Sequence, residues 1–265
     1  MVSRELEIAF CELQLETEDI VIETVQMLKA DYDATMRKVL DIIALWWLHN
    51  DIKDLSDAQT HMPELMKELD GVIDPANEKY VEDMAEMFAQ VFEFNYEYAR
   101  KPLHIEEEKD SNPMFLFTAL GLATLAWASD GLTYEARMAL RKEQLKEEIR
   151  MIVLRGSTMG YSTKRIIEMV KKEMGKSKYR GVQMMVDEAN HFANEAIRQL
   201  AIDKFGGYEV SEVLDMKTCD HCRSMHGKKY TWNEYEVGLT APRFHPSCRG
   251  RIIPIDKIPQ NIKHI

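Results

Sequence analysis

Three cysteines and one histidine near the C-terminus form the pattern in this sequence with the clearest chemistry. Cys219 and Cys222 stand in a Cys-Asp-His-Cys turn, and His245 and Cys248 stand in a His-Pro-Ser-Cys turn after twenty-two further residues. Two close pairs of soft ligands separated by a loop suit a tetrahedral metal ion, because each pair binds from one tight turn. The spacing therefore predicts one structural Zn²⁺ per chain, bound by these four residues.

The predicted site has four protein ligands and no open position, which is typical of structural rather than catalytic zinc. A small strand-containing segment has too little core to be stable alone, and a metal can supply the missing folding energy. We therefore expect the loss of one thiolate to unfold the segment after Tyr208 and to leave the helices intact. Cys11, the remaining cysteine, is expected to have no part in the site.

Other interpretations of this cluster stay open at the level of the sequence. His221 and His226 are close enough along the chain to replace His245 as the nitrogen ligand, although His221 lies inside the Cys-x-x-Cys turn, where a side chain usually points away. The alternative without a metal is a set of buried free thiols beside a solvated histidine. We favour the metal because two paired ligand turns rarely arise by chance.

Known catalytic patterns are weak or absent. Zinc deaminases combine His-x-Glu with Pro-Cys-x-x-Cys. Here His104-Ile105-Glu106 lies more than a hundred residues before Cys219, which follows a threonine. The sequence contains no Walker loop, dinucleotide fingerprint, Gly-x-Ser-x-Gly or His-Glu-x-x-His. We therefore predict that the chain is not an enzyme, and we interpret His104 as a solvated linker residue.

A second polar set lies on the helix expected at 182–204. Glu188, His191 and Glu195 recur at positions i, i+3 and i+7, so they share one face of that helix. A carboxylate-bridged metal site needs a second Glu-x-x-His set, and we find none. We therefore interpret these residues as a solvated or intersubunit polar face.

Helices are expected to position the Cys/His cluster. Apolar residues recur at helical spacing over most of the chain, and glycine and proline are scarce. The expected helices cover residues 4–50, 78–100, 111–129, 134–155, 163–175 and 182–204. Turn and linker residues predict a loop near 51–63, turns at 70–71 and 74–75, and a linker at 101–111. Short strands are expected at 208–210 and 212–214.

The fold class that follows is mostly α, with a multi-helix body and a small C-terminal β-containing, zinc-stabilised module. We divide the chain into an acidic helical region (1–110), a second helical region (111–207) and the Cys/His zinc-binding module (208–265). The apolar stretch at 111–129 is shorter and more polar than a membrane-spanning helix, so we expect a buried core helix and no membrane contact. The N-terminus does not read as a signal peptide, which favours reduced thiols and a metal over disulfides.

Charge is distributed unevenly along the chain. Residues 1–110 carry 10 basic and 27 acidic side chains, whereas residues 111–265 carry 24 basic and 18 acidic. An acidic first part argues against nonspecific binding of nucleic acid through that part. The stretch 155–180, with 8 basic and 2 acidic residues, is suited to phosphates or an acidic protein surface, or is a solvated helix face. The asymmetry indicates two surfaces with different partners.

The Cys/His segment resembles the phage Mu F-like head-morphogenesis family, also called phage minor head or minor capsid proteins. The resemblance rests on Thr-Cys-x-x-Cys at 218–222, Gly-Lys at 227–228 and His-Pro-x-Cys-Arg at 245–249, and it extends over roughly Trp127 to Ile255. Further similar positions are Trp127, Asp130, Gly131, Arg137, Glu188, His191, Asn194, Glu195 and Ala196. Two positions depart from the family pattern: Gly250 stands where a further cysteine is usual, and 241–244 replaces a Pro-Pro.

The resemblance implies a low-copy, nonenzymatic structural protein of a phage or prophage head. Such proteins associate with the portal or inner capsid during head morphogenesis, so the implied partners are portal, capsid or scaffold proteins and, for some relatives, packaged DNA. The implied location is the virion, and the host cytoplasm during assembly. Some relatives carry a fused toxin or enzyme, for which we expect no room after Ile255. The alternative is a zinc-containing nucleic-acid-binding protein that uses the basic stretch 155–180.

Overall fold

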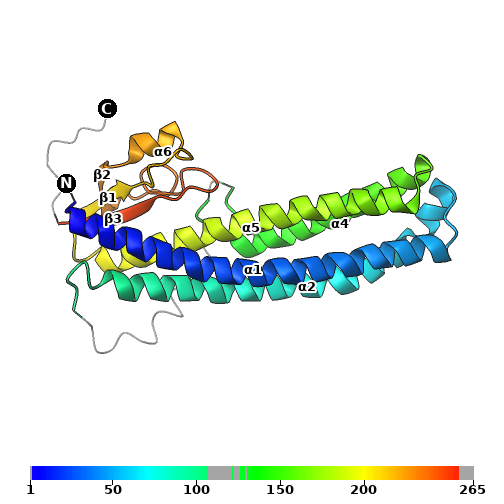
Figure 1. Cartoon of the computed structure of the whole chain (residues 1–265), viewed down its shortest axis with the longest axis horizontal. Helices are drawn as coiled ribbons and strands as arrows, with labels where there is room; N and C mark the ends of the chain where they lie inside the picture. The colour runs from blue at the N-terminus through cyan, green and yellow to red at the C-terminus, as the bar shows by residue number, and fades with distance from the viewer. Residues whose placement is uncertain (1, 107–120, 122–125, 129, 257–265) are drawn as a thin grey trace. The chain divides into compact units, whose positions relative to one another are not determined.

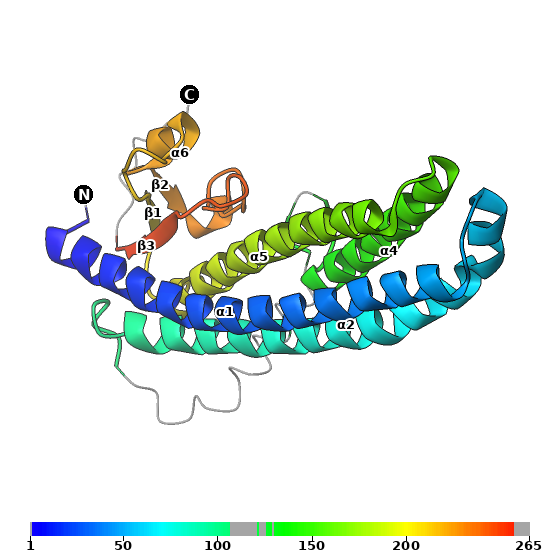
Figure 2. The same cartoon turned by 45° about the vertical axis from the view of Figure 1, so that its right-hand side comes forward.

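The computed structural model describes residues 2–106, 121, 126–128 and 130–256 (Figures 1 and 2). Most of the described residues are helical, and a small strand region lies near the C-terminus, so the expected mostly-α class is confirmed. The long helices are α1 (Arg4–His49), α2 (Leu55–Ala99), α4 (Tyr134–Thr158) and α5 (Thr163–Ala201). The helix expected at 111–129 lies outside the described residues, apart from 121 and 126–128. None of the described helices is both long and apolar enough to cross a membrane.

The second helix is longer than the sequence predicts. Helix α2 runs without a break through Pro63 and Pro75, so the expected loop at 51–63 is wrong beyond residue 54, and the turns at 70–75 are wrong. Apolar residues that keep helical spacing between the two prolines are buried: Leu65, Leu69 and Ile73. Each buried side chain contributes roughly 1.5–3 kcal/mol, so the three together offset a cost of about 3 kcal/mol for each proline.

Helix α5 joins two segments that the sequence separates. The expected stop at Gly175 is wrong, because the helix continues from Thr163 to Ala201. Its start is capped by Ser162, whose Oγ accepts a hydrogen bond from the backbone N–H of Arg165 at 3.3 Å. A glycine inside a helix costs only about 1 kcal/mol relative to alanine, so it does not end a helix whose buried face continues on both sides.

Three short strands form one antiparallel sheet. They are β1 (Gly207–Ser211), β2 (Lys229–Thr231) and β3 (Arg251–Ile255), in the order β2-β1-β3. Tyr208 lies opposite Tyr230 on one side and Pro254 on the other. The strand expected at 208–210 is confirmed, whereas 212–214 is not a strand. The short helix α6 (Asp220–Met225) and the 3₁₀ turn η1 (Trp232–Glu234) lie in the connections.

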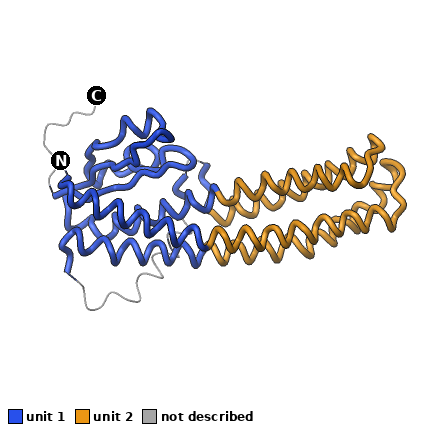
Figure 3. The backbone as a smooth tube through the Cα atoms, viewed as in Figure 1, with its two compact units in different colours: residues 1–23, 85–133, 183–265 blue, residues 24–84, 134–182 orange. Residues whose placement is uncertain are grey.

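The chain forms two compact units, each built from segments that are distant in sequence (Figure 3). Unit 1 comprises residues 1–23, 85–133 and 183–265, and unit 2 comprises 24–84 and 134–182. The units therefore do not follow the consecutive regions 1–110, 111–207 and 208–265, which stay a prediction about functional regions. In unit 2, apolar residues of α4 and α5 are buried in one core cluster, with Ile149 and Ile166 fully enclosed.

In unit 1, the sheet shares one apolar core with helices. Tyr208, Ile252 and Ile253 from the strands pack in the same cluster as helix residues. The helix residues of that cluster include Phe10, Leu13, Ala99, Ile197 and Leu200. The strands therefore do not depend on a metal for their whole core, in contrast to the metal-dependent module that the sequence indicates.

Candidate metal centre

The first pair of predicted ligands is placed by the start of helix α6. Cys219 is the N-cap residue of this helix, and its sulfur accepts a hydrogen bond from the backbone N–H of Cys222 at 3.4 Å. Cys222 is one turn further on and is buried, whereas Cys219 is exposed. The N-cap geometry therefore directs both sulfurs toward the same side of the turn, as the Cys-x-x-Cys spacing predicts.

The second pair of ligands comes from a tight turn in the irregular segment before β3. The backbone N–H of Cys248 donates to the carbonyl oxygen of His245 at 3.1 Å, which closes the turn. Ser247, between them, has a φ of 63°, in the left-handed region. This turn brings the imidazole and the third sulfur back toward α6.

The structure places the four predicted residues in two groups of potential ligands, Cys219 with Cys222 and His245, and Cys248 with Cys222 and Glu212. The Nε2 atom of His245 lies 3.3 Å from the sulfur of Cys219 and 3.0 Å from that of Cys222, and the sulfurs of Cys222 and Cys248 are 3.9 Å apart. In a tetrahedral zinc site, bond lengths near 2.3 Å to sulfur and 2.0 Å to nitrogen separate two sulfurs by about 3.8 Å and sulfur from nitrogen by about 3.5 Å. The pairs that include Cys222 therefore have separations near those of donors to one such ion, whereas Cys248 does not join Cys219 and His245 in one group within 4.8 Å.

A neighbouring carbonyl fixes the tautomer of His245. Its Nδ1 lies 2.8 Å from the carbonyl oxygen of Pro246. Because a carbonyl oxygen can only accept, Nδ1 carries the proton and Nε2 keeps the lone pair that a metal needs. Orientation of a ligating imidazole through its other nitrogen is usual at metal sites.

The thiols differ in how readily they ionise. The backbone N–H of Cys222 stabilises the Cys219 thiolate and lowers the pKa of that thiol. Burial raises the pKa of the Cys222 thiol well above its ordinary value, and the neighbouring Cys248 and Glu212 add to the effect. A bound cation would reverse this penalty, so metal binding at Cys222 releases a proton and is weakened by acid.

The alternative histidines do not join the cluster. His221 is exposed, and its ring packs edge-on against Phe244 with centroids 5.2 Å apart. The Nδ1 atom of His226 accepts a hydrogen bond from the backbone N–H of Glu212 at 3.1 Å. Neither residue, nor His104, belongs to the groups of clustered metal-ligating side chains found among the described residues.

Glu212 is a site residue that the sequence analysis missed. Its side chain is buried just after β1, and its Oε1 lies 3.7 Å from the sulfur of Cys248. Glu212, Cys222 and Cys248 form a second group of potential ligand atoms, all within 4.8 Å of one another. Burial raises the pKa of Glu212 to about 7. A single glutamate after a strand has no distinctive spacing, so the sequence carried no signal for it.

The polar set on α5 is buried, so its interpretation as a solvated or intersubunit face is wrong. Glu188, His191 and Glu195 are each less than 5% exposed. An oxygen of Glu188 accepts a hydrogen bond from Nε1 of Trp127 at 2.6 Å, and the rings of His191 and Trp127 stack with centroids 4.7 Å apart. This face of the helix packs inside unit 1.

Other polar residues of α5 hold the segment that carries His245 and Cys248. Oδ1 of Asp187 accepts a hydrogen bond from the backbone N–H of Ser247 at 2.8 Å and also pairs with buried Arg243. Further along the helix, Asn194 donates to the carbonyl of Gly250 at 3.3 Å and accepts from the N–H of Ile252 at 3.0 Å. The helix therefore fixes this segment on both sides of Cys248.

An ion pair joins the two ligand turns from outside the cluster. Arg249 donates two hydrogen bonds to the carboxylate of Asp215, at 2.8 Å and 2.7 Å. The Arg249 guanidinium holds the pKa of Asp215 well below its usual range. Because Asp215 precedes Cys219 and Arg249 follows Cys248, the pair limits the separation of the two turns.

We expect Arg249→Lys to weaken metal binding without unfolding the protein. Lysine cannot make the two parallel bonds of a guanidinium, and loss of an outer contact at a metal site typically costs roughly 10–100-fold in affinity. Competition with a chromophoric chelator measures the change. Arg150→Lys is the matched control, because Arg150 makes an equivalent two-bond pair with Glu147 in unit 2. Equal affinities for wild type and Arg249→Lys would contradict a role for this pair.

Comparison with known proteins identifies a family for the segment that contains this cluster. Residues 147–253 match the sequence model of the family described as Phage Mu protein F like protein. The match includes all of α5 and all four predicted ligands, and it confirms the resemblance seen in the sequence, within the expected limits of Trp127 and Ile255. No curated protein and no solved structure matches the chain.

Proposed function

We propose that this chain, which carries a region of the phage Mu protein F like family at 147–253, is a structural minor head protein of a phage or prophage. It would act in head morphogenesis, next to the portal or the inner capsid surface. The observation that carries this proposal is the family match, because it covers the Cys/His cluster together with the α5 residues that support it. The implied locations are the virion and, during assembly, the host cytoplasm.

We further propose that Cys219, Cys222, His245 and Cys248 bind a structural Zn²⁺. Three sulfurs and one imidazole nitrogen are a donor set that zinc accepts readily, and the Cys222 sulfur lies 3.0 Å from His245 Nε2 and 3.9 Å from the Cys248 sulfur. When bound, the ion supplies a cross-link between the α6 turn and the turn before β3. Four protein donors leave no position for a substrate, which supports a nonenzymatic role.

A row of exposed apolar residues on α1 supplies a surface for a head protein partner. Ile8, Leu15 and Ile22 are 50%, 62% and 49% exposed and recur every seven residues, so they lie along one side of the helix. Exposed acidic residues flank the row at Glu12, Glu16, Asp19 and Glu23. An apolar stripe with an acidic border on one side suits an amphipathic helix that carries basic residues along the matching border.

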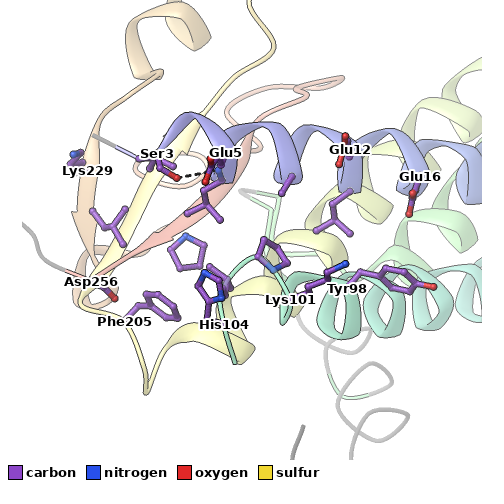
Figure 4. Close-up of a pocket in the computed structure, with 18 residues that line it drawn as sticks. Ser3, Glu5, Glu12, Glu16, Tyr98, Lys101, His104, Phe205, Lys229 and Asp256 are labelled. Carbon is purple, nitrogen blue, oxygen red and sulfur yellow. Dashed lines mark hydrogen bonds between the residues drawn. The ribbon is translucent and has the colours of Figure 1, made fainter. Parts of the chain in front are cut away.

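The acidic border continues into a groove of about 1160 Å³ in unit 1 (Figure 4). Glu12 and Glu16 line this groove together with Tyr98 and Lys101 from the end of α2 and the following turn, and with Phe205 before β1. None of the potential metal ligands lines the groove. The groove therefore extends the α1 surface and is separate from the candidate metal centre.

Photo-crosslinking in assembling heads tests the proposed function. Cys11 is exposed on α1 between Ile8 and Leu15, so a thiol-linked photo-crosslinker at this position should capture portal, capsid or scaffold protein in purified procapsids. Leu15→Glu should reduce both the crosslink and incorporation into heads severalfold, because it places a charge in the apolar row. Leu239→Glu is the control, since Leu239 is equally exposed away from α1. Absence of the protein from procapsids and particles would overturn the proposal.

A nucleic-acid-binding role is the second candidate, favoured by one observation. The side chains of Lys164, Arg165, Lys171, Lys172 and Arg180 are exposed on α5. Others in the stretch are paired, since Lys176 contacts Glu173 and Lys178 contacts Asp33, each at 2.6 Å. Binding of duplex DNA that falls steeply with salt would support this role, and its absence at low salt would exclude it.

A further inference from the structure

Unit 2 carries equal numbers of opposite charges but separates them on its surface (orange in Figure 3). Its two segments, 24–84 and 134–182, together contain 19 lysines and arginines and 19 acidic residues. Among the exposed charged side chains of α1 and α5 in this unit, nine are basic and two are acidic, whereas those of α2 and α4 comprise eight acidic and three basic. The unit therefore has a basic side and an acidic side but no net charge.

Contacts within unit 2 place α2 and α5 at opposite corners. Asp31 and Asp33 of α1 form ion pairs with α2 and α5, respectively. Lys146 of α4 forms an ion pair with α2, and Ile166 of α5 lies over Gly156 of α4. Because α2 and α5 each lie beside both α1 and α4, their exposed faces point away from each other, as in a four-helix bundle.

The exposed charges on these two corners form stripes of similar length. The basic stripe on α5 consists of Lys164, Arg165, Lys171, Lys172, Lys176 and Arg180, and the acidic stripe on α2 consists of Glu64, Glu68, Glu78 and Glu82. At 1.5 Å per residue, the basic stripe extends over about 24 Å and the acidic stripe over about 27 Å. In the part of the chain that the structure describes, Lys171, Lys172, Glu68 and Glu82 form no ion pair. Both stripes therefore present charge that a partner can neutralise.

We propose that the basic stripe of one copy of this chain binds the acidic stripe of a second copy. The two stripes have opposite charge and nearly equal length, and the same kind of pairing already joins neighbouring helices of the unit, as between Lys178 and Asp33 at 2.6 Å. A nucleic acid suits the basic stripe less well, because unit 2 as a whole has no net positive charge to attract a polyanion. The proposal depends neither on the metal nor on a role in a phage head.

The opposite directions of the stripes determine the kind of assembly. A two-fold dimer would need both stripes on one face, so the contact must join different surfaces of the two copies. Such a head-to-tail contact leaves one basic and one acidic stripe free, and further copies can add until a ring closes or a chain extends. Exposed ion pairs are individually weak and screened by salt, so the association should be reversible and sensitive to ionic strength.

Sedimentation velocity on the full chain tests this proposal. Wild type should form species larger than dimers as its concentration rises in about 50 mM NaCl, and it should return to monomer in about 500 mM NaCl. Lys171→Glu/Lys172→Glu and Glu68→Lys/Glu82→Lys should each weaken the association at least about tenfold, because each reverses two charges of one stripe. The matched control is Lys217→Glu/Lys228→Glu, which changes two exposed lysines of unit 1 and should associate as wild type does.

An equimolar mixture of the two stripe variants gives the sharpest result. It should form dimers with about the wild-type affinity, because one variant keeps the acidic stripe and the other keeps the basic stripe. A mixture that stays monomeric would overturn the pairing of these two stripes, and so would a wild type that stays monomeric at low salt. Association through the apolar row of α1 would persist at high salt and in both variants, which would also overturn the proposal.

Two further measurements keep the result decisive. If wild type is monomeric but binds a labelled DNA duplex, and Lys171→Glu/Lys172→Glu does not, the basic stripe serves nucleic acid and the proposal is wrong. Circular dichroism checks that each variant is folded. If one variant does not fold, the other variant and the salt dependence of the wild type still decide the question.

Discussion

Replacing Cys222 with serine is expected to abolish metal binding, taking the protein from about one ion per chain to none. Cys222 is the centre of the cluster, because its sulfur is 3.0 Å from His245 Nε2 and 3.9 Å from the Cys248 sulfur and belongs to both groups of potential ligands. Its removal therefore leaves no arrangement in which the remaining donors surround one ion. The turn at 219–222 and the segment before β3 should then separate and become sensitive to protease.

The structure limits how far this loss should spread. The sequence alone indicates that everything after Tyr208 unfolds, but Tyr208 and Ile252 lie in one core with helix residues such as Phe10 and Leu200. We therefore expect β1 and β3 to stay folded while the connections open, as limited proteolysis with mass spectrometry would show. Cys11→Ser is the control and should keep both metal and protease resistance, since Cys11 lies exposed on α1. Full metal content in Cys222→Ser would mean that the ligand assignment is wrong.

The parts of this structure that the sequence predicts well are those encoded locally. The extent of α1 follows from apolar spacing without proline or glycine, and the Cys/His cluster follows from two short turns whose geometry is set by neighbouring residues. Glu212 and Gly250 show the opposite case. The two positions are far apart in sequence but adjacent in the structure. In the sequence alone, Gly250 was seen only as a departure from the family pattern, and Glu212 gave no sign of a role at the site.

Tertiary packing explains the main errors. Proline and glycine mark the end of a helix reliably only where the apolar residues on either side are not buried in a common core. Pro75 and Gly175 both lie inside long helices with buried residues on either side. A polar face on a helix looks the same in sequence whether solvent or protein covers it. Glu188 and His191 are covered by Trp127, which is sixty-one residues from Glu188 in the chain, and helical periodicity contains no information about that partner.

Asn194→Ala is expected to be among the most destabilising single substitutions in unit 1. The side chain is 1% exposed and satisfies two backbone groups of the final segment, the carbonyl of Gly250 and the N–H of Ile252. Alanine would leave both groups buried without partners, at roughly 1–3 kcal/mol each. The free energy of unfolding should fall by about 2–6 kcal/mol, measured by urea denaturation of the metal-loaded protein, with hydrogen exchange accelerated at 251–255.

Asn190→Ala supplies the matched comparison, one turn earlier on the same helix. Its amide donates one long hydrogen bond, to the carbonyl of Cys248 at 3.5 Å, so its loss should cost no more than about 1 kcal/mol. A loss of unfolding free energy of no more than about 1 kcal/mol for Asn194→Ala would contradict its role in holding the segment around Gly250 and Ile252. Because Asn194 and the metal hold the same segment, their effects should not add. The substitution should cost less in metal-free protein, where the segment before β3 is already loosened and the bond to Gly250 is formed less often.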